Sequence, residues 1–397
     1  MSIERKKGIE VVLGKFPVFT DISNIFDNLI ISFLDDISKA IKSNRKFYKF
    51  PDLVQFGFWC RKPNLIKISE KYKSKNLMIG RGIVLHITPS NVPLNFAYSF
   101  VFGMLSGNTN LVRLPSRRFI QINLLCKIIK DLCKKKKYLS LKKKICFIRF
   151  KRSDEIASYF SSKADCRVIW GGDETVNQFK NYKTKLRCID LTFPNRYSAS
   201  IIDLNSIIKI NSIELSQVVQ RFYNDCYTMD QQGCSSPQSV IWIGKKNNFK
   251  KNKFWTVLKN IVERKYHHDL PVANKKIISI SKLAITNQTK FVCDMKNFKV
   301  ARIKIKNHSR NIEKIQCHFG TFAEVNVGKI EELKNTISEK FQTITYYGFK
   351  KKDIENLIVK FNIKGVDRVV PIGRAFDMSE IWDGYNIINS LSRIVGN

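Results

Sequence analysis

The sequence lacks any apolar run long enough to cross a bilayer, which takes about 20 consecutive apolar residues in a helix. Its most apolar segment, residues 92–105, is shorter than that and carries Asn95, so we expect a buried helix there. The N-terminus also lacks an apolar core followed by a small-residue cleavage site, the pattern of a secretory signal. Together these absences predict a cytoplasmic protein.

None of the ten cysteines forms a Cys-x-x-Cys pair, so a zinc ribbon or a thioredoxin-like motif is not expected, and we predict no metal site. Without an export signal, most of these residues should be reduced thiols. Cys126, Cys146 and Cys166 lie among apolar residues and fit the ordinary interpretation of a small buried side chain. Cys234 differs, because it stands in DQQGCSSPQS (residues 230–239), where a glycine and a proline predict a turn.

Acidic residues are scarce: 33 aspartates and glutamates face 70 lysines and arginines, for a net charge of +37. Such a charge suggests nucleic acid as a partner. However, lysine is spread over almost every segment together with abundant asparagine and isoleucine, as in proteins from genomes rich in A and T. No zinc finger, RNA-recognition motif or helix-turn-helix signature is present. We therefore expect no specific nucleic-acid partner, while loose contact with an anionic membrane surface remains open.

Short apolar runs alternate with longer amphipathic ones, which predicts an α/β fold with a mainly parallel sheet. The expected strands are residues 82–87, 110–114, 145–150, 167–170, 187–191 and 240–243. The expected helices are residues 26–41, 94–105, 119–133, a helix from Glu174, and residues 213–229, 331–341, 352–361 and 379–394.

Three loops at expected strand ends are candidate sites, because open parallel sheets bind ligands beyond the carboxyl ends of their strands. The first is the segment HITPSNVP (86–93). The second contains Gly171 and Gly172, which open a helix and would let a phosphate approach its free N–H groups. The third is the cysteine turn.

Together these segments carry a resemblance to a known superfamily. HITPSNVP followed by SGNTNLVRLPS (106–116) resembles the aldehyde dehydrogenase signature, and DQQGCSSPQS resembles the segment of its nucleophile. The tail GVDRVVPIGRAFDMSEIWDG (365–384) is similar to that of the LuxC-type acyl-CoA reductases, and the likeness runs from about residue 75 to the C-terminus.

The resemblance implies the aldehyde dehydrogenase fold, with a Rossmann-type parallel-sheet domain and an α/β catalytic domain. The expected divisions are a helical lead-in (1–75), a dinucleotide-binding domain (76–195), a catalytic domain (196–365) and a C-terminal segment (366–397) that returns to the first domain or forms an oligomer interface.

The resemblance also implies site residues. Cys234 is the expected nucleophile for an acyl thioester, and a turn of this kind favours the thiolate. The amide of Asn91, with the Cys234 N–H, is expected around the carbonyl oxygen; from its residues alone Asn91 fits equally well as a turn residue before Pro93. The expected cofactor-binding residues are Pro89, Gly171, Gly172, Arg113 and Phe319.

Three departures from the superfamily pattern are informative. The glutamate that activates water has its place at Thr192 in DLTFPNRYS (190–198), although Asp190 remains an alternative. The glutamate for the nicotinamide ribose has its place near Cys317 in QCHFGTFAEV (316–325). The place of the lysine that contacts the adenosine ribose is taken by Leu114. A nearby arginine would instead contact a 2′-phosphate, and the candidates are Arg113, Arg117 and Arg118. A 2′-phosphate site favours NADPH over NADH.

These expectations combine into an NADPH-dependent reductase of long-chain acyl thioesters, carried by coenzyme A or by an acyl carrier protein. Two alternatives are a dehydrogenase that oxidises an aldehyde to the acid, and a basic protein that binds nucleic acid or a membrane surface. The resemblance further implies a homo-oligomer and an acyl-transferring partner enzyme.

Overall fold

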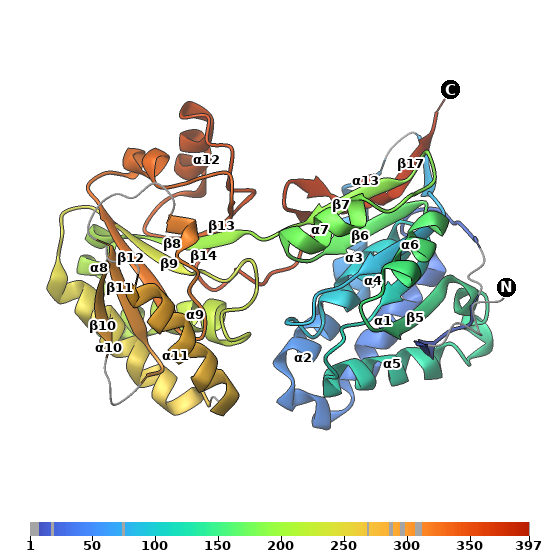
Figure 1. The fold of residues 1–397 in the computed structure, drawn as a ribbon, viewed down its shortest axis with the longest axis horizontal. Coiled ribbons are helices and arrows are strands. Elements are labelled where there is room, and N and C mark those ends of the chain that lie inside the picture. Colours follow the sequence, from blue (N-terminus) through green and yellow to red (C-terminus); the bar gives the residue numbers. More distant parts are fainter. Residues whose placement is uncertain are drawn as a thin grey trace. The chain divides into compact units, whose positions relative to one another are not determined.

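The structure is a computed structural model that describes residues 8–16, 20–73, 76–267, 270–285, 289–293, 298–305 and 312–396. The chain forms two compact units (Figure 1): unit 1 contains Met1–Pro194 and Met378–Asn397, and unit 2 contains Asn195–Asp377. Each unit is built on a largely parallel sheet with helices, so the predicted α/β class is confirmed. Within the described residues, no helix has the length and apolar character needed to cross a membrane.

Unit 1 is centred on a six-stranded sheet of order β1-β5-β4-β3-β6-β7. Five of its strands are parallel and lie within two residues of the predicted ranges. They are β3 (Ile83–Ile87), β4 (Thr109–Arg113), β5 (Ile145–Phe150), β6 (Cys166–Trp170) and β7 (Ile189–Phe193). The edge strand β1 (Ile9–Leu13) pairs antiparallel with β5. It lies in the segment expected to be a helical lead-in.

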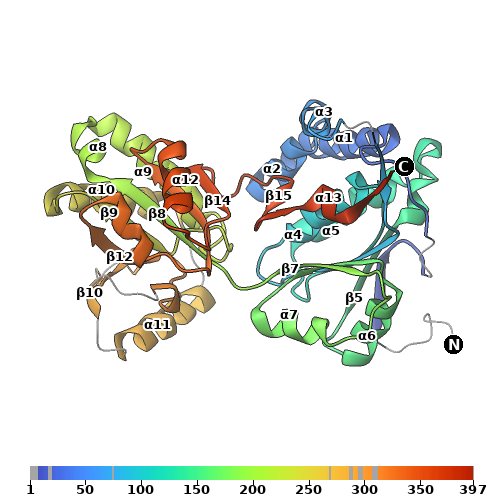
Figure 2. The same ribbon diagram turned by 90° about the horizontal axis from the view of Figure 1, so that it is seen from above.

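Helices cover both faces of this sheet (Figure 2). On one face lie α6 (Asp154–Lys163) and α7 (Asp173–Lys180), and their core includes Leu85, Ile148 and Ile169. On the other lie α4 (Asn95–Leu105), α5 (Ile120–Leu132) and α1 (Asn28–Lys42). α2 (Pro51–Trp59) and α3 (Lys62–Glu70) pack against α1. The predicted helices 26–41, 94–105 and 119–133 are confirmed.

The C-terminal segment of unit 1 does not form the long helix predicted over residues 379–394. It contains β15 (Ile381–Trp382), β16 (Tyr385–Asn386), α13 (Ile387–Leu391) and β17 (Ser392–Val395). The chain reverses at Asp383 and Gly384, whose φ angles are 48° and 75°, a conformation that no helix interior tolerates. β17 then pairs with β2 (Leu77–Gly80), an interaction across some 300 residues of sequence that local periodicity does not reveal.

Unit 2 contains a seven-stranded sheet of order β10-β11-β12-β9-β8-β13-β14, parallel except for the β10–β11 pair. Its strands are β8 (Tyr197–Asp203), β9 (Ser239–Ile243), β10 (Thr289–Cys293), β11 (Ala301–Ile305), β12 (Thr321–Val327), β13 (Phe341–Tyr347) and β14 (Arg368–Pro371). Its helices are α8 (Leu204–Lys209), α9 (Ser212–Tyr227), α10 (Asn248–Lys265), α11 (Leu270–Ile285) and α12 (Lys351–Lys360).

The sequence predicts α9, α12 and β9 correctly, but the helix expected over residues 331–341 is wrong. A short 3₁₀ helix (Ile330–Asn335) occupies its start, and β13 begins at Phe341. β13 is buried between β8 and β14, and strands buried in this way lack the alternation of apolar and polar residues that identifies an exposed strand.

Candidate functional site

The carboxyl edge of the unit 1 sheet brings two of the predicted loops together. In the sheet β3 lies between β4 and β6. From β3 the successive strands are added toward one edge as β4 and β5, and then toward the other edge as β6 and β7. Pro89 and Asn91 follow β3, while Gly171 and Gly172 follow its neighbour β6. Both loops therefore leave the sheet at a topological switch point, where open α/β sheets bind ligands.

The glycine pair has a specific local role. A Cβ atom on Gly171 would lie 2.9 Å from the side chain of Thr175, so the turn has no room for a larger residue. Gly172 caps α7, whose first turn carries Asp173 and Glu174. Two carboxylates here would repel a pyrophosphate placed directly on this helix end. Binding of a phosphate at Gly171 and Gly172 thus stays a prediction.

A pocket of about 240 Å³ lies at the ends of β4 and β5, between those ends and the helices α6 and α7. Its lining combines positively charged, hydroxyl, amide and aromatic side chains. The residues are Arg113, Arg152, Ser116, Ser153, Thr175, Gln178, Phe150, Phe179, Tyr182 and Ala157. Cationic, hydroxyl and aromatic groups in one pocket suit the phosphate, ribose and base of a nucleotide.

Arg113 is the predicted cofactor residue in this pocket. Its guanidinium lies 4.8 Å from the centre of the Phe150 ring and donates to the Phe150 carbonyl at 3.3 Å. Its Nε is buried without a hydrogen-bond partner among the described residues, and burial lowers the pKa of the side chain. A buried donor of this kind would gain by meeting an anion.

The other two candidate arginines are not among the pocket's lining residues. Arg118 pairs with Glu10 at 3.1 Å, and Arg117 stacks over Phe119. Arg152, which the sequence analysis did not select, does line the pocket and donates to Gln178 at 3.3 Å. It follows β5 by two residues, and only the order of strands in the sheet reveals that it lies near Arg113.

The base of the Pro89–Asn91 loop is held by three hydrogen bonds from two residues, His86 of β3 and Thr88, which directly follows that strand. The Thr88 hydroxyl donates to the carbonyl of Arg113 at 2.7 Å. His86 is fully buried between Ser99 (2.7 Å) and Asn110 (2.9 Å). Burial lowers the pKa of this histidine to about 4, so it is neutral at physiological pH and serves as a hydrogen-bonding link between the sheet and α4.

In unit 2, the cysteine turn lies between the end of α9 and the start of β9. It therefore faces the amino ends of the parallel strands, whereas the sequence analysis placed all three loops at carboxyl ends; that expectation was wrong for this loop. The Ser198 hydroxyl, from the start of β8, donates to the Cys234 carbonyl at 2.6 Å. Gln342, from the start of β13, directs its amide Nε2 at the Cys234 sulfur at 3.4 Å.

Cys234 is partly exposed, whereas Cys226 and Cys317 are buried. Burial raises the pKa of the Cys317 thiol to about 12 and that of Cys226 well above its usual value. Those two thiols therefore stay protonated. Cys234 is instead partly exposed and has an amide donor at its sulfur, an environment that suits a reactive thiol better than burial does.

Gln231 holds the cysteine turn in place through hydrogen bonds to backbone groups of neighbouring segments. Its side chain is fully buried. Its Nε2 donates to the carbonyls of Pro237 and Thr321, each at 2.8 Å, and its Oε1 accepts the N–H groups of Gly320 and Thr321. Asp230 and Gln231 both have positive φ angles, 53° and 58°, and consecutive strained residues of this kind are maintained by such surrounding contacts.

Phe319, one of the expected cofactor-binding residues, lies against this turn. Its N–H donates to the Asp230 carbonyl at 3.1 Å, and its side chain is buried. The segment ending in Phe319 and Gly320 is therefore joined to the cysteine segment through Gln231 and Asp230. No pattern in the sequence revealed Ser198 or Gln342 as neighbours of Cys234, because they lie 36 and 108 residues away and contacts over such separations leave no local signal.

The tail segment that carries part of the family resemblance (residues 365–384) also contacts the cysteine turn. Asp225 of α9 is buried and accepts the N–H groups of Gly373 (2.6 Å) and Ala375 (2.9 Å). Burial raises the pKa of its carboxyl to about 7. The next residue, Phe376, packs so closely on Gly233 that a Cβ atom there would lie 2.6 Å from the ring. The tail segment 373–376 thus holds one side of the turn.

The two residues considered for a water-activating base differ in their contacts. Asp190 forms a bidentate ion pair with the buried Arg167. Its Oδ1 accepts from the arginine Nε at 2.7 Å and its Oδ2 accepts from Nη2 at 2.5 Å. Its carboxylate is therefore engaged with an arginine. Thr192 lies two residues further along β7 and carries no ionisable group. Among the described residues, no cluster of three or more histidine, cysteine, aspartate or glutamate side chains could hold a metal ion.

The predicted residues thus fall into two groups. Pro89, Asn91, Arg113 and the two glycines belong to unit 1, and Cys234 and Phe319 belong to unit 2. The structure brings together the members of each group, and the approach of Asn91 to Cys234 remains a prediction.

Comparisons with known proteins agree with the resemblance. The family model described as "Acyl-CoA reductase (LuxC)" matches residues 65–394. No curated protein matches the sequence.

Solved structures with similar folds include a proline utilization A (PutA) from Bdellovibrio bacteriovorus, inactivated by N-propargylglycine. The match has a TM-score of 0.65 at 13% identity and covers 92% of this chain and 43% of that one. This chain therefore spans less than half of the PutA chain.

Two shorter dehydrogenases are similar over most of their length. An NAD-dependent benzaldehyde dehydrogenase from Corynebacterium glutamicum has a TM-score of 0.62 at 11% identity, covering 92% of this chain and 84% of that one. A 1-pyrroline-5-carboxylate dehydrogenase from Thermus thermophilus has a TM-score of 0.64 at 10% identity, covering 92% and 80%. At such identities the likeness shows the fold, which is the predicted aldehyde dehydrogenase fold.

Proposed function

Since the chain belongs to the LuxC acyl-CoA reductase family, we propose that it reduces a long-chain acyl thioester to the fatty aldehyde with NADPH, through an acyl group on Cys234. The observation that carries this proposal is the Cys234 turn: a partly exposed thiol with an amide donor at its sulfur, held by contacts from α9, β8, β12 and β13.

The proposed reaction begins with attack of the Cys234 thiolate on the thioester carbonyl. The carbon–sulfur bond to the carrier breaks, and the carrier leaves as its thiolate. The amide of Asn91 and the Cys234 N–H would stabilise the charge that develops on the carbonyl oxygen, a contribution typically of about 3 kcal/mol for one donor. When bound, the nicotinamide supplies the hydride. Collapse of the thiohemiacetal on Cys234 then releases the aldehyde and regenerates the thiolate.

The ion pair of Asp190 supports a reductase over an aldehyde-oxidising enzyme. A water-activating base must have a free carboxylate near the acyl group, whereas the Asp190 carboxylate is bound to Arg167. With Thr192 at the place of the superfamily glutamate, the acyl group on Cys234 would be spared from hydrolysis. The alternative of an aldehyde dehydrogenase that produces the free acid is therefore less well supported.

The pocket beside Arg113 supports NADPH as the reductant. Arg113 offers a buried Nε without a partner among the described residues, and Arg152 adds a second cation to the lining. These residues would hold the 2′-phosphate of NADPH, and Phe150, Phe179 and Tyr182 would contact its adenosine. Pro89, Gly171, Gly172 and Phe319 are proposed to contact the rest of the cofactor.

The donor and assembly of the enzyme are likewise proposals. The acyl group would come from coenzyme A or an acyl carrier protein, directly or through an acyl-transferring partner enzyme, and the chain would act as a homo-oligomer. Peripheral contact with a membrane fits the apolar product. No specific nucleic acid is proposed.

The function is tested by incubating the protein with NADPH and acyl-CoA substrates of increasing chain length, with mass spectrometry of the products. We expect fatty aldehyde, with a preference for long chains, and none from Cys234→Ala. Cys188→Ala is the matched control, because Cys188 is also partly exposed, and should keep full activity. Absence of aldehyde from the unaltered protein would refute the proposal.

The cofactor is tested with Arg152→Ala, whose side chain is exposed and is not needed for the core. Loss of one charged contact to a phosphate should raise the KM for NADPH about tenfold or more and leave that for NADH unchanged. Arg118→Ala is the control, because Arg118 pairs with Glu10 and is not among the pocket's lining residues. An equal change for both cofactors would contradict a 2′-phosphate site here.

A further inference from the structure

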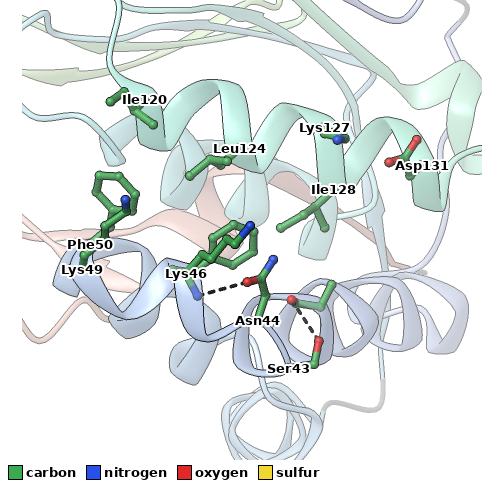
Figure 3. A pocket seen from close by; sticks show the side chains of 12 residues that line it. Ser43, Asn44, Lys46, Lys49, Phe50, Ile120, Leu124, Lys127, Ile128 and Asp131 are labelled. Carbon is green, nitrogen blue, oxygen red and sulfur yellow. Dashed lines mark hydrogen bonds between the residues drawn. The ribbon is translucent and has the colours of Figure 1, made fainter.

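A groove of about 510 Å³ lies in unit 1 between α5 and the segment that links α1 to α2. We call it the α5 groove, and Figure 3 shows its residues: Ala40, Ser43, Asn44, Lys46, Phe47, Lys49, Phe50, Ile120, Leu124, Lys127, Ile128 and Asp131. The proposed catalytic and cofactor residues are not among them.

One wall of the groove is an apolar stripe on α5. Ile120, Leu124 and Ile128 are spaced four residues apart and so lie along one face of the helix (Figure 3). The helix already buries a different face in the core, through Ile122, Leu125, Cys126, Ile129 and Leu132. The stripe therefore exceeds what the fold requires, and Ile120 is 63% exposed.

The opposite wall is made by the short 3₁₀ helix η2 (Arg45–Lys49) and Phe50. Its shape is fixed by local hydrogen bonds. The Asn44 side chain accepts the N–H of Lys46 at 3.0 Å, and the Ser43 hydroxyl donates to Ala40 at 3.2 Å (Figure 3). The groove is thus a formed feature of the fold that does not need to open before it can bind.

The rim of the groove is cationic. Lys46, Lys49 and Lys127 line it and are exposed. Among the described residues, no carboxylate forms an ion pair with Lys46 or Lys49. The one acidic lining residue, Asp131, is paired with Lys134 at 2.8 Å. The apolar floor is therefore bordered by two lysines, Lys46 and Lys49, whose charge no carboxylate among the described residues balances, and by Lys127, which lies near Asp131.

From these contacts we propose that the α5 groove binds an acidic amphipathic helix of a partner protein. The stripe on α5 repeats every four residues, and rows of that spacing interdigitate with the same rows of a second helix. A helix with apolar residues at i, i+4 and i+8 would fill the groove, and flanking aspartates or glutamates would meet the three lysines.

Two other occupants fit less well. A second copy of this chain carries the same charge of +37, so its approach to a lysine rim is opposed by like charges. An anionic lipid surface would satisfy the lysines, but a bilayer is bound by protruding apolar groups, whereas most of this apolar surface lines a hollow. The inference does not rest on the proposed reductase activity.

The probe is a fluorescent, hydrocarbon-stapled peptide of about 15 residues, which is about 22 Å of helix, with leucines at i, i+4 and i+8 and glutamates beside them. Fluorescence anisotropy with the full chain should show micromolar binding that weakens as salt is added. The double variant Lys46→Glu/Lys49→Glu should weaken binding about tenfold or more, because two favourable charges become repulsive. Ile120→Glu should weaken it similarly.

The matched control is Lys350→Glu/Lys352→Glu, which makes the same charge change on exposed lysines of unit 2 and should leave binding unchanged apart from the small effect of net charge. Circular dichroism verifies that each variant is folded. Equal binding of a peptide with lysines in place of the glutamates, or no effect of the Lys46/Lys49 variant, would overturn the proposal. So would failure of the acidic peptide to bind while phosphatidylglycerol vesicles bind through the same lysines.

Discussion

At the scale of single residues, we expect the amide of Gln342 to increase the reactivity of the proposed nucleophile. Its Nε2 donates to the Cys234 sulfur, and a donor at sulfur favours the thiolate over the thiol. We predict that Gln342→Leu slows alkylation of Cys234 by iodoacetamide about tenfold at neutral pH, since a hydrogen bond to a charged group contributes about 1.5 kcal/mol. Peptide mapping by mass spectrometry measures the rate at Cys234.

Cys226 is an internal control in the same digest. It is buried eight residues earlier in the sequence, and should remain unmodified in both proteins. An unchanged rate at Cys234 in Gln342→Leu would mean that the amide contact does not influence the sulfur.

His86 is expected to make unit 1 sensitive to acid. Its pKa is lowered by burial to about 4, whereas an unfolded histidine has a value of about 6.5. The unfolded chain therefore binds a proton first as the pH falls, and the stabilisation, complete above pH 6.5, is lost progressively toward pH 4. We predict that the difference in unfolding free energy between the unaltered protein and His86→Asn decreases by about 2 kcal/mol between pH 7 and pH 5.

The unaltered protein must be compared with the His86→Asn variant, because Asp225 changes the free energy of unfolding with pH in the opposite direction. Burial raises the pKa of Asp225 to about 7, so its contribution to stability falls as the pH rises from about 4 to 7. Denaturant titrations of both proteins at the two pH values give the difference directly. If the difference stays constant, His86 does not remain neutral in the folded protein.

At the scale of elements, the brace between the cysteine turn and β12 depends on Gln231. Leucine there would remove four hydrogen bonds to buried backbone groups, two carbonyls and two N–H groups. Of these groups, the Thr321 N–H keeps its bond to the His318 carbonyl and the Pro237 carbonyl keeps its contact with the Cys226 thiol. We predict that Gln231→Leu lowers the free energy of unfolding by about 3 kcal/mol or more. Gln217→Leu, an exposed change on α9, should be nearly neutral, and equal effects of the two substitutions would refute the bracing role.

The sequence predicted the elements of unit 1 better than those of unit 2. Strands β3 to β6 and helices α4, α5 and α7 follow one another with clear alternation of apolar runs, so their positions were predicted within one or two residues. β13 and the C-terminal β17 were missed because each is fixed by pairing with a distant strand, β8 or β2. Local periodicity contains no information on such pairing.

The same limit applies to the candidate site. Cys234, Asn91 and the glycine pair were selected because each lies in a motif of adjacent residues. Gln342 lies 108 residues from Cys234, and Arg152 lies near Arg113 only because β4 and β5 are neighbours in the sheet. Side chains that support a site from another element are recognised once the fold is known.

At the scale of the whole molecule, both units contribute to the proposed reaction, with Asn91 and Arg113 in one and Cys234 in the other. A reductase of this kind must also protect its acyl group from water. Since the Asp190 carboxylate is held by Arg167, we predict that the enzyme converts aldehyde, NADP and coenzyme A back to acyl-CoA but makes little free acid when coenzyme A is omitted. A general base would raise hydrolysis by about 10²–10⁴-fold.

Mass spectrometry of the products made from aldehyde and NADP measures this directly. Thr192→Glu is the informative variant, because it restores a carboxylate at the place of the superfamily base and should increase the yield of acid. Rapid acid formation by the unaltered protein, abolished by Asp190→Asn, would instead identify it as an aldehyde dehydrogenase.

The central claim is that Cys234 accepts the acyl group, and isotope labelling tests it most directly. The protein is incubated with an acyl-CoA labelled in its acyl chain, without any nicotinamide cofactor, and then digested for mass spectrometry. The account predicts label on the peptide that contains Cys234, none on that of Cys226, and release of labelled aldehyde when NADPH is added. Full labelling of the Cys234→Ala variant, or label that NADPH cannot release as aldehyde, would contradict it.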